Sequence, residues 1–373
     1  MSNQTVGVTG SGGFVGSHLV RRLRSLDGVD VRECPREAWA DDSALADWVA
    51  GCDAVVHLAG MNRGEDGEIE RVNRGLIDLL LDAASAAGDP PRVVFASSTQ
   101  SERDNPYGRS KAYGERRVAE WAASASGRES ASLVIPNVYG PGCKPFYNSV
   151  VATFCHQVAV GESPTVVQDS RIEFVWVNQL VEQISKAALG RDLSGGSVRV
   201  SGTAELSVTE LLAKIEGFRD SDASDVVPDL NDALDASLYA TYRYYLPPEA
   251  HAIRPTVHAD DRGKLFEVIR LAGGGQVFYS TTKPGVVRGN HYHTRKIEWF
   301  CVLRGEAAIR MRRVDDDSVH EFRISGEKPE FVSIPVLHTH QIENVGDDEL
   351  LTMFWCNEIF EAEDPDTFYE QVA

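Results

Sequence analysis

The pattern of apolar residues changes once along this chain, near Thr256, and the change limits what the chain can fold into. Before that point, short apolar runs alternate with segments of helical spacing, which predicts an α/β domain with a doubly wound parallel sheet. Beyond it, short alternating runs separated by Gly and Asp turns predict an antiparallel all-β domain. At 373 residues the chain is long enough for both domains.

The expected elements follow from this pattern. In the first half we expect strands at residues 5–9, 29–34, 54–60, 92–98, 132–136 and 197–201, and helices at 14–26, 43–50, 73–87, 149–160 and 209–215. In the second half we expect strands at 276–282, 298–303, 307–312, 331–334 and 350–355. Residues 218–252 turn polar, then aromatic, and we interpret them as an exit segment. The predicted domains are residues 1–245 and 257–373, joined by a linker at 246–256.

The composition excludes several classes of protein. Hydrophobic residues make up 42% and charged residues 25% of the chain, as in soluble globular proteins. A net charge of −19 argues against a nucleic-acid partner, because phosphate binding needs a basic face. Since no apolar run approaches a membrane span and the start does not resemble a signal peptide, we expect a cytoplasmic protein without membrane contact. Six cysteines without a Cys-x-x-Cys pair fit free thiols in a reducing compartment.

A nucleotide-binding turn follows the first strand. The segment Thr9-Gly10-x-x-Gly13-x-x-Gly16 lies between a strand and a helix, so free N–H groups at the helix start can hold a pyrophosphate. In this interpretation Gly10 makes the turn, Gly13 lets the backbone approach the phosphates, and Gly16 allows close packing of the helix on the sheet. The alternative is a tight structural turn without a ligand.

The end of the second strand bears on which dinucleotide would bind. An NAD site usually places an acidic residue there, where it holds the ribose 2′-hydroxyl. Cys34 occupies about that position and Arg36 could pair with a 2′-phosphate, which favours NADPH. Glu33 is close enough to leave NADH open, and Arg36 is also compatible with a solvated surface charge.

Tyr107 and Lys111 are the clearest catalytic candidates of the first half. Positions i and i+4 share one face of a helix, so the Lys111 ammonium can lie near the Tyr107 phenol and lower its pKa. Ser98, at the end of the preceding strand, can hydrogen-bond a substrate oxygen. Tyr-x3-Lys alone is common by chance, but here it follows both the glycine turn and a buried strand that ends at Gly60.

A second set of chemical groups lies in the last third of the chain. His291, His293 and Glu298 fall in Gly-x5-His-x-His-x4-Glu-x6-Gly, and His340 follows in Pro-x4-His-x3-Asn. Three imidazoles and a carboxylate suit Zn, Fe, Mn or Ni, so these residues predict one divalent metal per chain. The alternatives are a metal-free polar pocket and, for the ligand list, His338 as a rival to His340.

These motifs carry two resemblances. Residues 4–245 resemble the extended short-chain dehydrogenase/reductase family, most of whose members act on nucleotide-activated sugars. That resemblance implies catalytic roles for Ser98, Tyr107 and Lys111, with Tyr107 protonating a carbonyl during hydride delivery. Residues 257–373 are similar to the cupin superfamily in the spacing of their two histidine segments, although Leu337 replaces a motif glycine. The implied fold class is a Rossmann-type doubly wound sheet followed by an all-β cupin barrel.

Nearly the whole chain also resembles the CapF family of bifunctional capsular polysaccharide synthesis enzymes. The matching stretches lie at residues 58–63, 136–140, 148–154, 261–263, 282–285, 289–293, 342–346 and 365–367. The resemblances imply cofactor contacts from Gly10, Gly13, Phe14, Val15, Gly16, Arg36, Leu58, Ala59, Gly60, Tyr107 and Lys111. They imply substrate contacts from Asn62, Arg63, Asn137 and Asn148.

The CapF resemblance implies a two-step conversion of a UDP-linked 4-keto-6-deoxy-2-acetamido sugar. The cupin domain would epimerise C3, and the reductase domain would reduce the C4 ketone with NADPH to a 6-deoxytalose-type product. Zn is the implied metal and a homodimer the implied assembly. Lys296 is a candidate proton carrier or oxyanion partner, and equally compatible with a solvent-facing lysine. The rival functions are a 4-reductase with a structural or dimerising cupin, and a metabolite-sensing binding protein.

Overall fold

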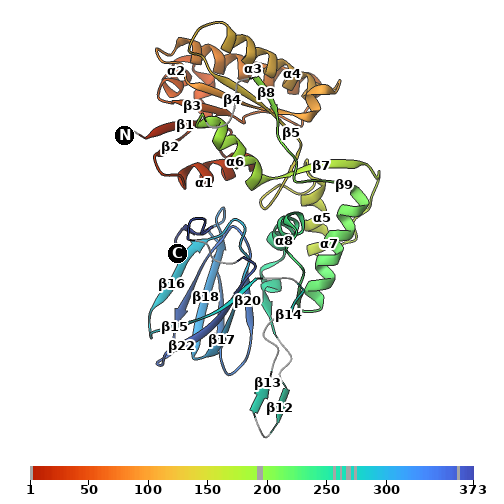
Figure 1. The fold of residues 1–373 in the computed structure, drawn as a ribbon, viewed down its shortest axis with the longest axis vertical. Coiled ribbons are helices and arrows are strands. Elements are labelled where there is room, and N and C mark those ends of the chain that lie inside the picture. The colour runs from red at the N-terminus through yellow and green to blue at the C-terminus, as the bar shows by residue number, and fades with distance from the viewer. Residues whose placement is uncertain are drawn as a thin grey trace. The chain divides into compact units, whose positions relative to one another are not determined.

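The computed structural model describes residues 3–190, 196–254, 258–260, 263–265, 270–272, 275–358 and 362–373. The chain divides into two compact units (Figure 1). Unit 1 consists of Met1–Val138 and Glu173–Glu205, and unit 2 of Tyr139–Ile172 and Leu206–Ala373. The predicted first domain, residues 1–245, therefore extends over both units. Residues 255–257, where the predicted linker ends and the second domain begins, lie outside the described residues, as do 261–262 of the CapF-like stretch.

A six-stranded parallel sheet forms the centre of unit 1. Its strands, in spatial order, are β2 (Val29–Glu33), β1 (Gln4–Thr9), β3 (Ala54–His57), β4 (Arg92–Ser98), β5 (Ser130–Ile135) and β8 (Gly196–Arg199). The order of strands reverses between β1 and β3, and ligands of open α/β sheets bind at the carboxyl ends of the strands beside such a reversal. The doubly wound fold predicted for this half is confirmed.

Helices cover both faces of this sheet because alternate strand residues point to opposite sides. The helices are α1 (Phe14–Arg24), α2 (Asp42–Ala50), α3 (Asp66–Ala86), α4 (Pro106–Ala123) and α6 (Val177–Ala188). Val56 packs with Leu19 and Ile184 in one core, on the side of α1 and α6. Its neighbour Val55 packs with Ile77 in a second core, on the side of α2, α3 and α4.

Two five-stranded antiparallel sheets form the larger β part of unit 2, in addition to the two-stranded pairs of β10 (Val226–Val227) with β14 (Arg270–Leu271) and of β12 (His258–Asp260) with β13 (Gly263–Leu265). The first contains β11 (Ala252–Ile253), β20 (Phe331–Ile334), β17 (Glu298–Arg304), β22 (Leu350–Cys356) and β15 (Gln276–Thr282). The second contains β19 (His320–Ser325), β18 (Glu306–Arg313), β21 (His338–Asn344), β16 (Val287–Tyr292) and β23 (Phe368–Tyr369). Phe300 and Phe354 of the first sheet share one core with Ile309 and Ile342 of the second. This arrangement agrees with the predicted antiparallel β domain.

Three helices also belong to unit 2, namely α5 (Val150–Ala159), α7 (Val208–Ala223) and α8 (Ala233–Tyr245). Helix α8 lies where the sequence predicted an exit segment. Asp232 begins it by accepting hydrogen bonds from the backbone N–H groups of Leu234 and Asp235. Tyr239 and Tyr242 of this helix are buried beside Phe218. The aromatic residues therefore belong to a packed helix rather than to an extended connection.

The remaining elements are short. They are η1 (Arg36–Ala40), η2 (Thr99–Glu102), η3 (Pro248–His251), β6 (Asn137–Tyr139), β7 (Arg171–Trp176), β9 (Ala204–Ser207), β10 (Val226–Val227), β12 (His258–Asp260), β13 (Gly263–Leu265) and β14 (Arg270–Leu271). In the described part of the chain, no helix has both the length and the apolar character that a bilayer crossing requires.

Candidate functional site

The glycine turn of unit 1 follows β1 and packs against the end of β3. Gly10 has a φ of +66°, and a Cβ atom there would lie 2.8 Å from the backbone nitrogen of Ala59. A Cβ atom on Gly16 would lie 2.1 Å from the carbonyl oxygen of Gly10. Both positions therefore require glycine for steric reasons. Gly16 contacts the turn itself, whereas the sequence predicted that it would allow the helix to approach the sheet. Phe14 and Val15 start α1 directly after the turn.

Thr9 and His57 hold the loop that follows β3. The Thr9 hydroxyl accepts hydrogen bonds from the backbone N–H groups of Leu58 and Ala59, each at 3.1 Å. It lies 2.9 Å from His57 Nδ1. A hydroxyl has two lone pairs and one proton, so Thr9 donates that proton to His57 Nδ1. Burial lowers the pKa of His57 to about 3, which keeps the ring neutral and suited to accept this bond.

Asn73 is a residue of this site that the sequence analysis missed. Its side chain accepts a hydrogen bond from Met61 N at 2.6 Å and donates to Met61 O at 2.8 Å. It also donates to Ser110 Oγ at 3.0 Å. Asn73 thus connects the loop after Gly60 to α4, the helix that carries Tyr107. An asparagine inside a helix, at a position with apolar spacing, is the signal that could have indicated this role.

Tyr107 and Lys111 lie one turn apart on α4, as predicted. Lys111 Nζ donates to the carbonyl oxygen of Ala96 at 2.7 Å and lies 5.4 Å from the centre of the Tyr107 ring. Burial lowers the pKa of Lys111 to about 8. Ser98 ends β4, and its hydroxyl accepts a hydrogen bond from Gln100 N at 3.2 Å.

The predicted direction of the Tyr107 pKa was wrong for this structure. Burial raises the pKa of Tyr107 to about 12 instead of lowering it. The desolvation of the phenolate outweighs the attraction of an ammonium group that is itself buried and engaged by Ala96. Tyr107 therefore keeps its proton at neutral pH, which suits a proton donor.

The remaining residues predicted for this site lie at the surface. Arg36 is exposed in η1, directly after Cys34 and Pro35. A Glu33 carboxylate oxygen forms an ion pair with a guanidinium nitrogen of Arg24, 2.8 Å away. The predicted substrate contacts are all exposed, with Asn62, Arg63 and Asn137 in unit 1 and Asn148 in unit 2.

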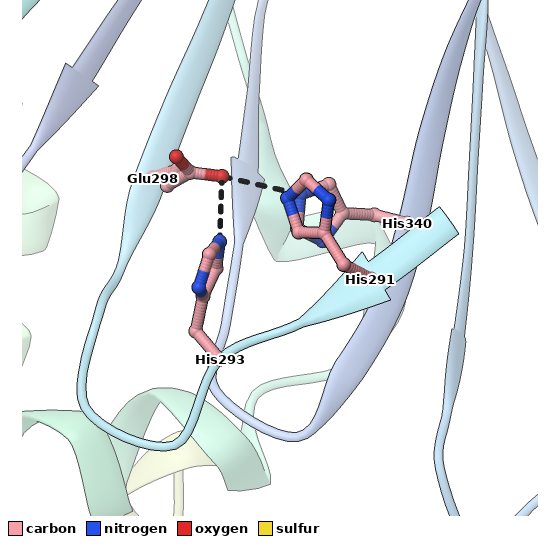
Figure 2. Close-up of side chains that lie close together, drawn as sticks. All are labelled: His291, His293, Glu298 and His340. Atoms are coloured by element: carbon pink, nitrogen blue, oxygen red, sulfur yellow. Dashed lines mark hydrogen bonds and ion pairs between the residues drawn. The ribbon is translucent and has the colours of Figure 1, made fainter. Parts of the chain in front are cut away.

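Figure 2 shows the second site, in which His291, His293, Glu298 and His340 converge. His291 comes from β16, His293 from the turn after it, Glu298 from β17 and His340 from β21. One ligand atom from each residue lies within 4.8 Å of those from the others. His293 Nε2 is 3.2 Å and His340 Nε2 is 3.1 Å from the same Glu298 oxygen. The structure thus brings together all four predicted ligands, which come from both sheets.

Backbone carbonyls determine which ring nitrogens face the centre of this cluster. His293 Nδ1 is 2.6 Å from the carbonyl oxygen of Asp366, and His340 Nδ1 is 3.1 Å from that of His338. A carbonyl oxygen only accepts, so each Nδ1 donates, and this fixes each ring with Nε2 facing Glu298. Although His340 Nε2 is near Glu298, it has no hydrogen-bond partner among the described residues. A buried nitrogen in this condition suits a metal ligand.

The electrostatics of the cluster also suit a cation. Burial alone would raise the pKa of Glu298, but the imidazoles of His293 and His340 outweigh it and hold the pKa well below its usual range. Burial lowers the pKa of His291 to about 4, and the two other imidazoles add to this effect. Glu298 outweighs burial at His293 and raises the pKa of that ring, so a metal ion would displace a proton there. The ionised carboxylate of Glu298 and the neutral ring of His291 are already in the forms that ligate metals.

His338, the rival ligand, does not join the cluster. Its Nδ1 donates to the carbonyl oxygen of Val336 at 2.9 Å. Its ring lies 6.0 Å from that of Tyr244 and 6.2 Å from that of His251, centre to centre. The preceding residue, Leu337, has a φ of +55°, the left-handed conformation that a motif glycine would adopt without strain.

Comparisons with known proteins agree with this geometry. The NAD dependent epimerase/dehydratase family matches residues 6–198, and the polysaccharide biosynthesis C-terminal domain matches residues 258–368. A Pseudomonas aeruginosa protein named UDP-2-acetamido-2,6-beta-L-arabino-hexul-4-ose reductase is 34% identical, over 97% of both chains. The capsular polysaccharide assembling protein CapF of Staphylococcus aureus is 33% identical, covering 99% of this chain and 100% of that one, with a TM-score of 0.64.

A more distant structure shows the fold alone. The Bordetella bronchiseptica enzyme WbmF, solved in complex with NAD+, is 21% identical and covers 65% of this chain and 92% of its own, with a TM-score of 0.53. The Tyr107–Lys111 pair, the glycine turn and the full-length matches together lead to one assignment. The chain belongs to the NAD dependent epimerase/dehydratase family and, along nearly its whole length, to the CapF family.

Proposed function

We propose that this protein converts a UDP-linked 4-keto-6-deoxy-2-acetamido sugar in two steps for surface polysaccharide synthesis. Unit 2, with a cupin-type metal site, epimerises C3, and unit 1 reduces the C4 ketone with NADPH to a talose-type product. The observation that carries the proposal is that one chain holds both the Tyr107–Lys111 pair and the cluster of His291, His293, Glu298 and His340. The name of the Pseudomonas relative supports it, since a hexul-4-ose is a 4-keto sugar.

In the reduction, NADPH, when bound, would supply a hydride for C4. Tyr107 donates its proton to the C4 oxygen, and its raised pKa keeps that proton available at neutral pH. Lys111, held by Ala96, places a positive charge beside the phenolate that remains and stabilises it. Ser98 hydrogen-bonds the same substrate oxygen. The resulting C4 alcohol accounts for both the hydride and the proton.

NADPH is proposed over NADH because of the two charges at the end of β2. The Glu33 carboxylate, which could hold a ribose 2′-hydroxyl, is engaged by Arg24. Arg36 is exposed and makes no ion pair within the described residues, so its guanidinium is available to a 2′-phosphate.

In the epimerisation, a proton leaves C3 and another returns on the opposite face. The C4 ketone acidifies the C3 proton, because the negative charge left behind spreads onto the C4 oxygen. His291, His293, Glu298 and His340 would hold one divalent ion, Zn in our proposal, which would supply positive charge for this oxygen. Lys296 is the proposed proton carrier or oxyanion partner. Its side chain is buried, and Nζ donates to the carbonyl oxygen of Pro365 at 2.6 Å.

Deuterium exchange tests the division of labour. A full-length Tyr107→Phe protein, given the 4-keto sugar nucleotide in D2O without NADPH, should incorporate deuterium at C3 and form no reduced product when NADPH is added. A His340→Ala protein should fail to exchange C3. If exchange requires both Tyr107 and cofactor, the metal site is not the epimerase. The function then reduces to that of a sugar-nucleotide 4-reductase with a structural or dimerising β domain.

A further inference from the structure

The dipeptide Pro365-Asp366, far along the chain from the histidine segments, holds the turn that joins β16 to β17. The Asp366 carboxylate accepts hydrogen bonds from three successive backbone N–H groups, those of Thr294, Arg295 and Lys296. The Arg295 and Lys296 bonds measure 2.8 and 3.0 Å. The Thr294 hydroxyl adds a fourth donor at 2.6 Å. Hydrogen bonds to an ionised acceptor are among the strongest available, so this turn is firmly held.

The same dipeptide directs a side chain at each end of the turn. The carbonyl oxygen of Asp366 accepts from His293 Nδ1 at 2.6 Å, which directs Nε2 of the ring toward Glu298, 3.2 Å away. The carbonyl oxygen of Pro365 accepts from Lys296 Nζ at 2.6 Å. A residue that served only to close the turn would need the backbone N–H groups alone. Here two further carbonyls hold a metal-ligand candidate and the proposed proton carrier.

The backbone conformation of Asp366 also indicates a functional role for this residue. Its φ is +42° although it is not glycine, and its side chain is buried. Left-handed backbone at such a residue costs of order 1 kcal/mol or more, and it persists where surrounding contacts require it. In this conformation the carboxylate and the carbonyl of one residue both reach the 293–296 turn.

We propose that Asp366 is a positioning residue for the second site, acting through His293 and Lys296. The proposal rests on the proposed function for the reaction concerned, but its effect on metal binding does not. Asp366→Asn would replace one acceptor oxygen by an N–H2 group that faces N–H donors. The turn would then lose its anchor, and His293 its orientation.

Metal affinity is the first measurement. Full-length Asp366→Asn, stripped of metal and titrated with Zn²⁺ or Co²⁺ against a chromophoric chelator, should bind about 10- to 100-fold more weakly than the unaltered protein. Asp364→Asn is the matched control. It makes the same chemical change two residues away, in an exposed ion pair with Arg295, and should leave the affinity within about twofold. The Co²⁺ absorption spectrum should change for Asp366→Asn alone.

A second variant covers the case in which Asp366→Asn does not fold. Thr294→Val removes one hydrogen bond to Asp366 and keeps all three backbone donors, so it should weaken metal binding by a smaller factor in the same direction. The proposal would be overturned if both variants bound metal within twofold of the affinity of Asp364→Asn. If only Thr294→Val folds, the same result for that variant alone would overturn it.

C3 exchange at saturating metal then tests the effect on Lys296. Asp366→Asn should remain slow even with the site filled, while Asp364→Asn should be normal. Full exchange by metal-saturated Asp366→Asn would limit Asp366 to holding His293 and overturn its role toward Lys296. If the unaltered protein itself performs no exchange, the proposed function fails, and the affinity measurements still decide the role of Asp366.

Discussion

Arg243 of α8 and Asp222 of α7 form an ion pair of 3.0 Å although the arginine side chain is only 1% exposed. The same guanidinium donates to Ser333 on β20 and lies 3.4 Å from His251 Nδ1 in η3. Tyr239 donates to the other Asp222 oxygen at 2.7 Å. This buried network fastens the helices of unit 2 to the sheet that carries Glu298.

Arg243→Met should therefore destabilise unit 2. Removing one partner of a buried pair leaves the other charge uncompensated, and we expect the free energy of unfolding to fall by roughly 3 kcal/mol. Urea unfolding followed by tryptophan fluorescence would measure this change, and hydrogen exchange would localise it to α8 and β20. Arg304→Met, which breaks an exposed pair with Glu349, is the control and should cost less than about 1 kcal/mol. Equal effects of the two changes would contradict the assignment.

Tyr107→Phe should slow NADPH oxidation by on the order of 100-fold or more, as the loss of a general acid does. Steady-state rates with the 4-keto sugar nucleotide would measure it. Tyr113→Phe makes the same change on the same helix, where the hydroxyl bonds Asp78 instead, and should keep near-normal rates. Near-normal turnover by Tyr107→Phe would remove Tyr107 from the mechanism.

The pH profile of reduction should report Lys111 rather than Tyr107. Because burial lowers the pKa of Lys111 to about 8, kcat/KM should fall as the pH rises through that value, well below the pKa of about 12 for Tyr107. Lys111→Arg should move this limb to higher pH, since a guanidinium keeps its proton. If kcat/KM of the unaltered enzyme stayed constant up to pH 10, the lowered pKa of Lys111 would be contradicted.

The lowered pKa of Lys111 also affects stability, but with the opposite sign: over the pH range in which kcat/KM falls, the free energy of unfolding should rise. An unfolded lysine titrates near 10.5, so between about pH 8 and 10.5 the unfolded chain binds more protons at Lys111 than the folded chain does. The contribution of this group to the free energy of unfolding therefore increases as the pH rises through that window.

Arg36→Ala should raise the KM for NADPH by about tenfold while leaving that for NADH little altered. The expected change corresponds to the loss of one charge-assisted hydrogen bond to a 2′-phosphate. Initial rates with each cofactor would measure it. Equal kinetics with NADPH and NADH in the unaltered enzyme would refute the preference.

His340→Ala should lose bound metal, whereas His338→Ala should retain about one ion per chain. His340 Nε2 lies in the cluster, 3.1 Å from a Glu298 oxygen, while His338 lies beside Tyr244 and His251. Elemental analysis of protein purified without chelator would count the ions. Stoichiometric metal in His340→Ala, or its loss in His338→Ala alone, would overturn the ligand list. So would an unaltered protein without metal.

Local sequence patterns predicted much of the fold and supplied the candidate residues of both sites. A strand such as 92–98 is predictable because the middle of a buried parallel strand, here residues 93–96, is an unbroken apolar run. Gly10 was predictable because a left-handed turn favours glycine. His291 and His293 were predictable because imidazoles in a His-x-His spacing, followed by Glu298, form a typical set of metal ligands. In each case neighbouring residues carry the necessary information.

Only the tertiary structure decided which segments, distant in the sequence, would come into contact. The sequence predicted a connecting segment where α8 lies. The stability of this helix comes from burial against Phe218 and from the Arg243–Asp222 pair, and local helix propensity contains no information about such contacts. The pKa of Tyr107 rose because desolvation depends on everything packed around the phenol. Asp366 reaches the 293–296 turn from some 70 residues away. Sequence by itself determined which chemical groups this protein has, and tertiary packing determined how they are buried, paired and oriented, since those energies arise between segments that are not neighbours in the chain.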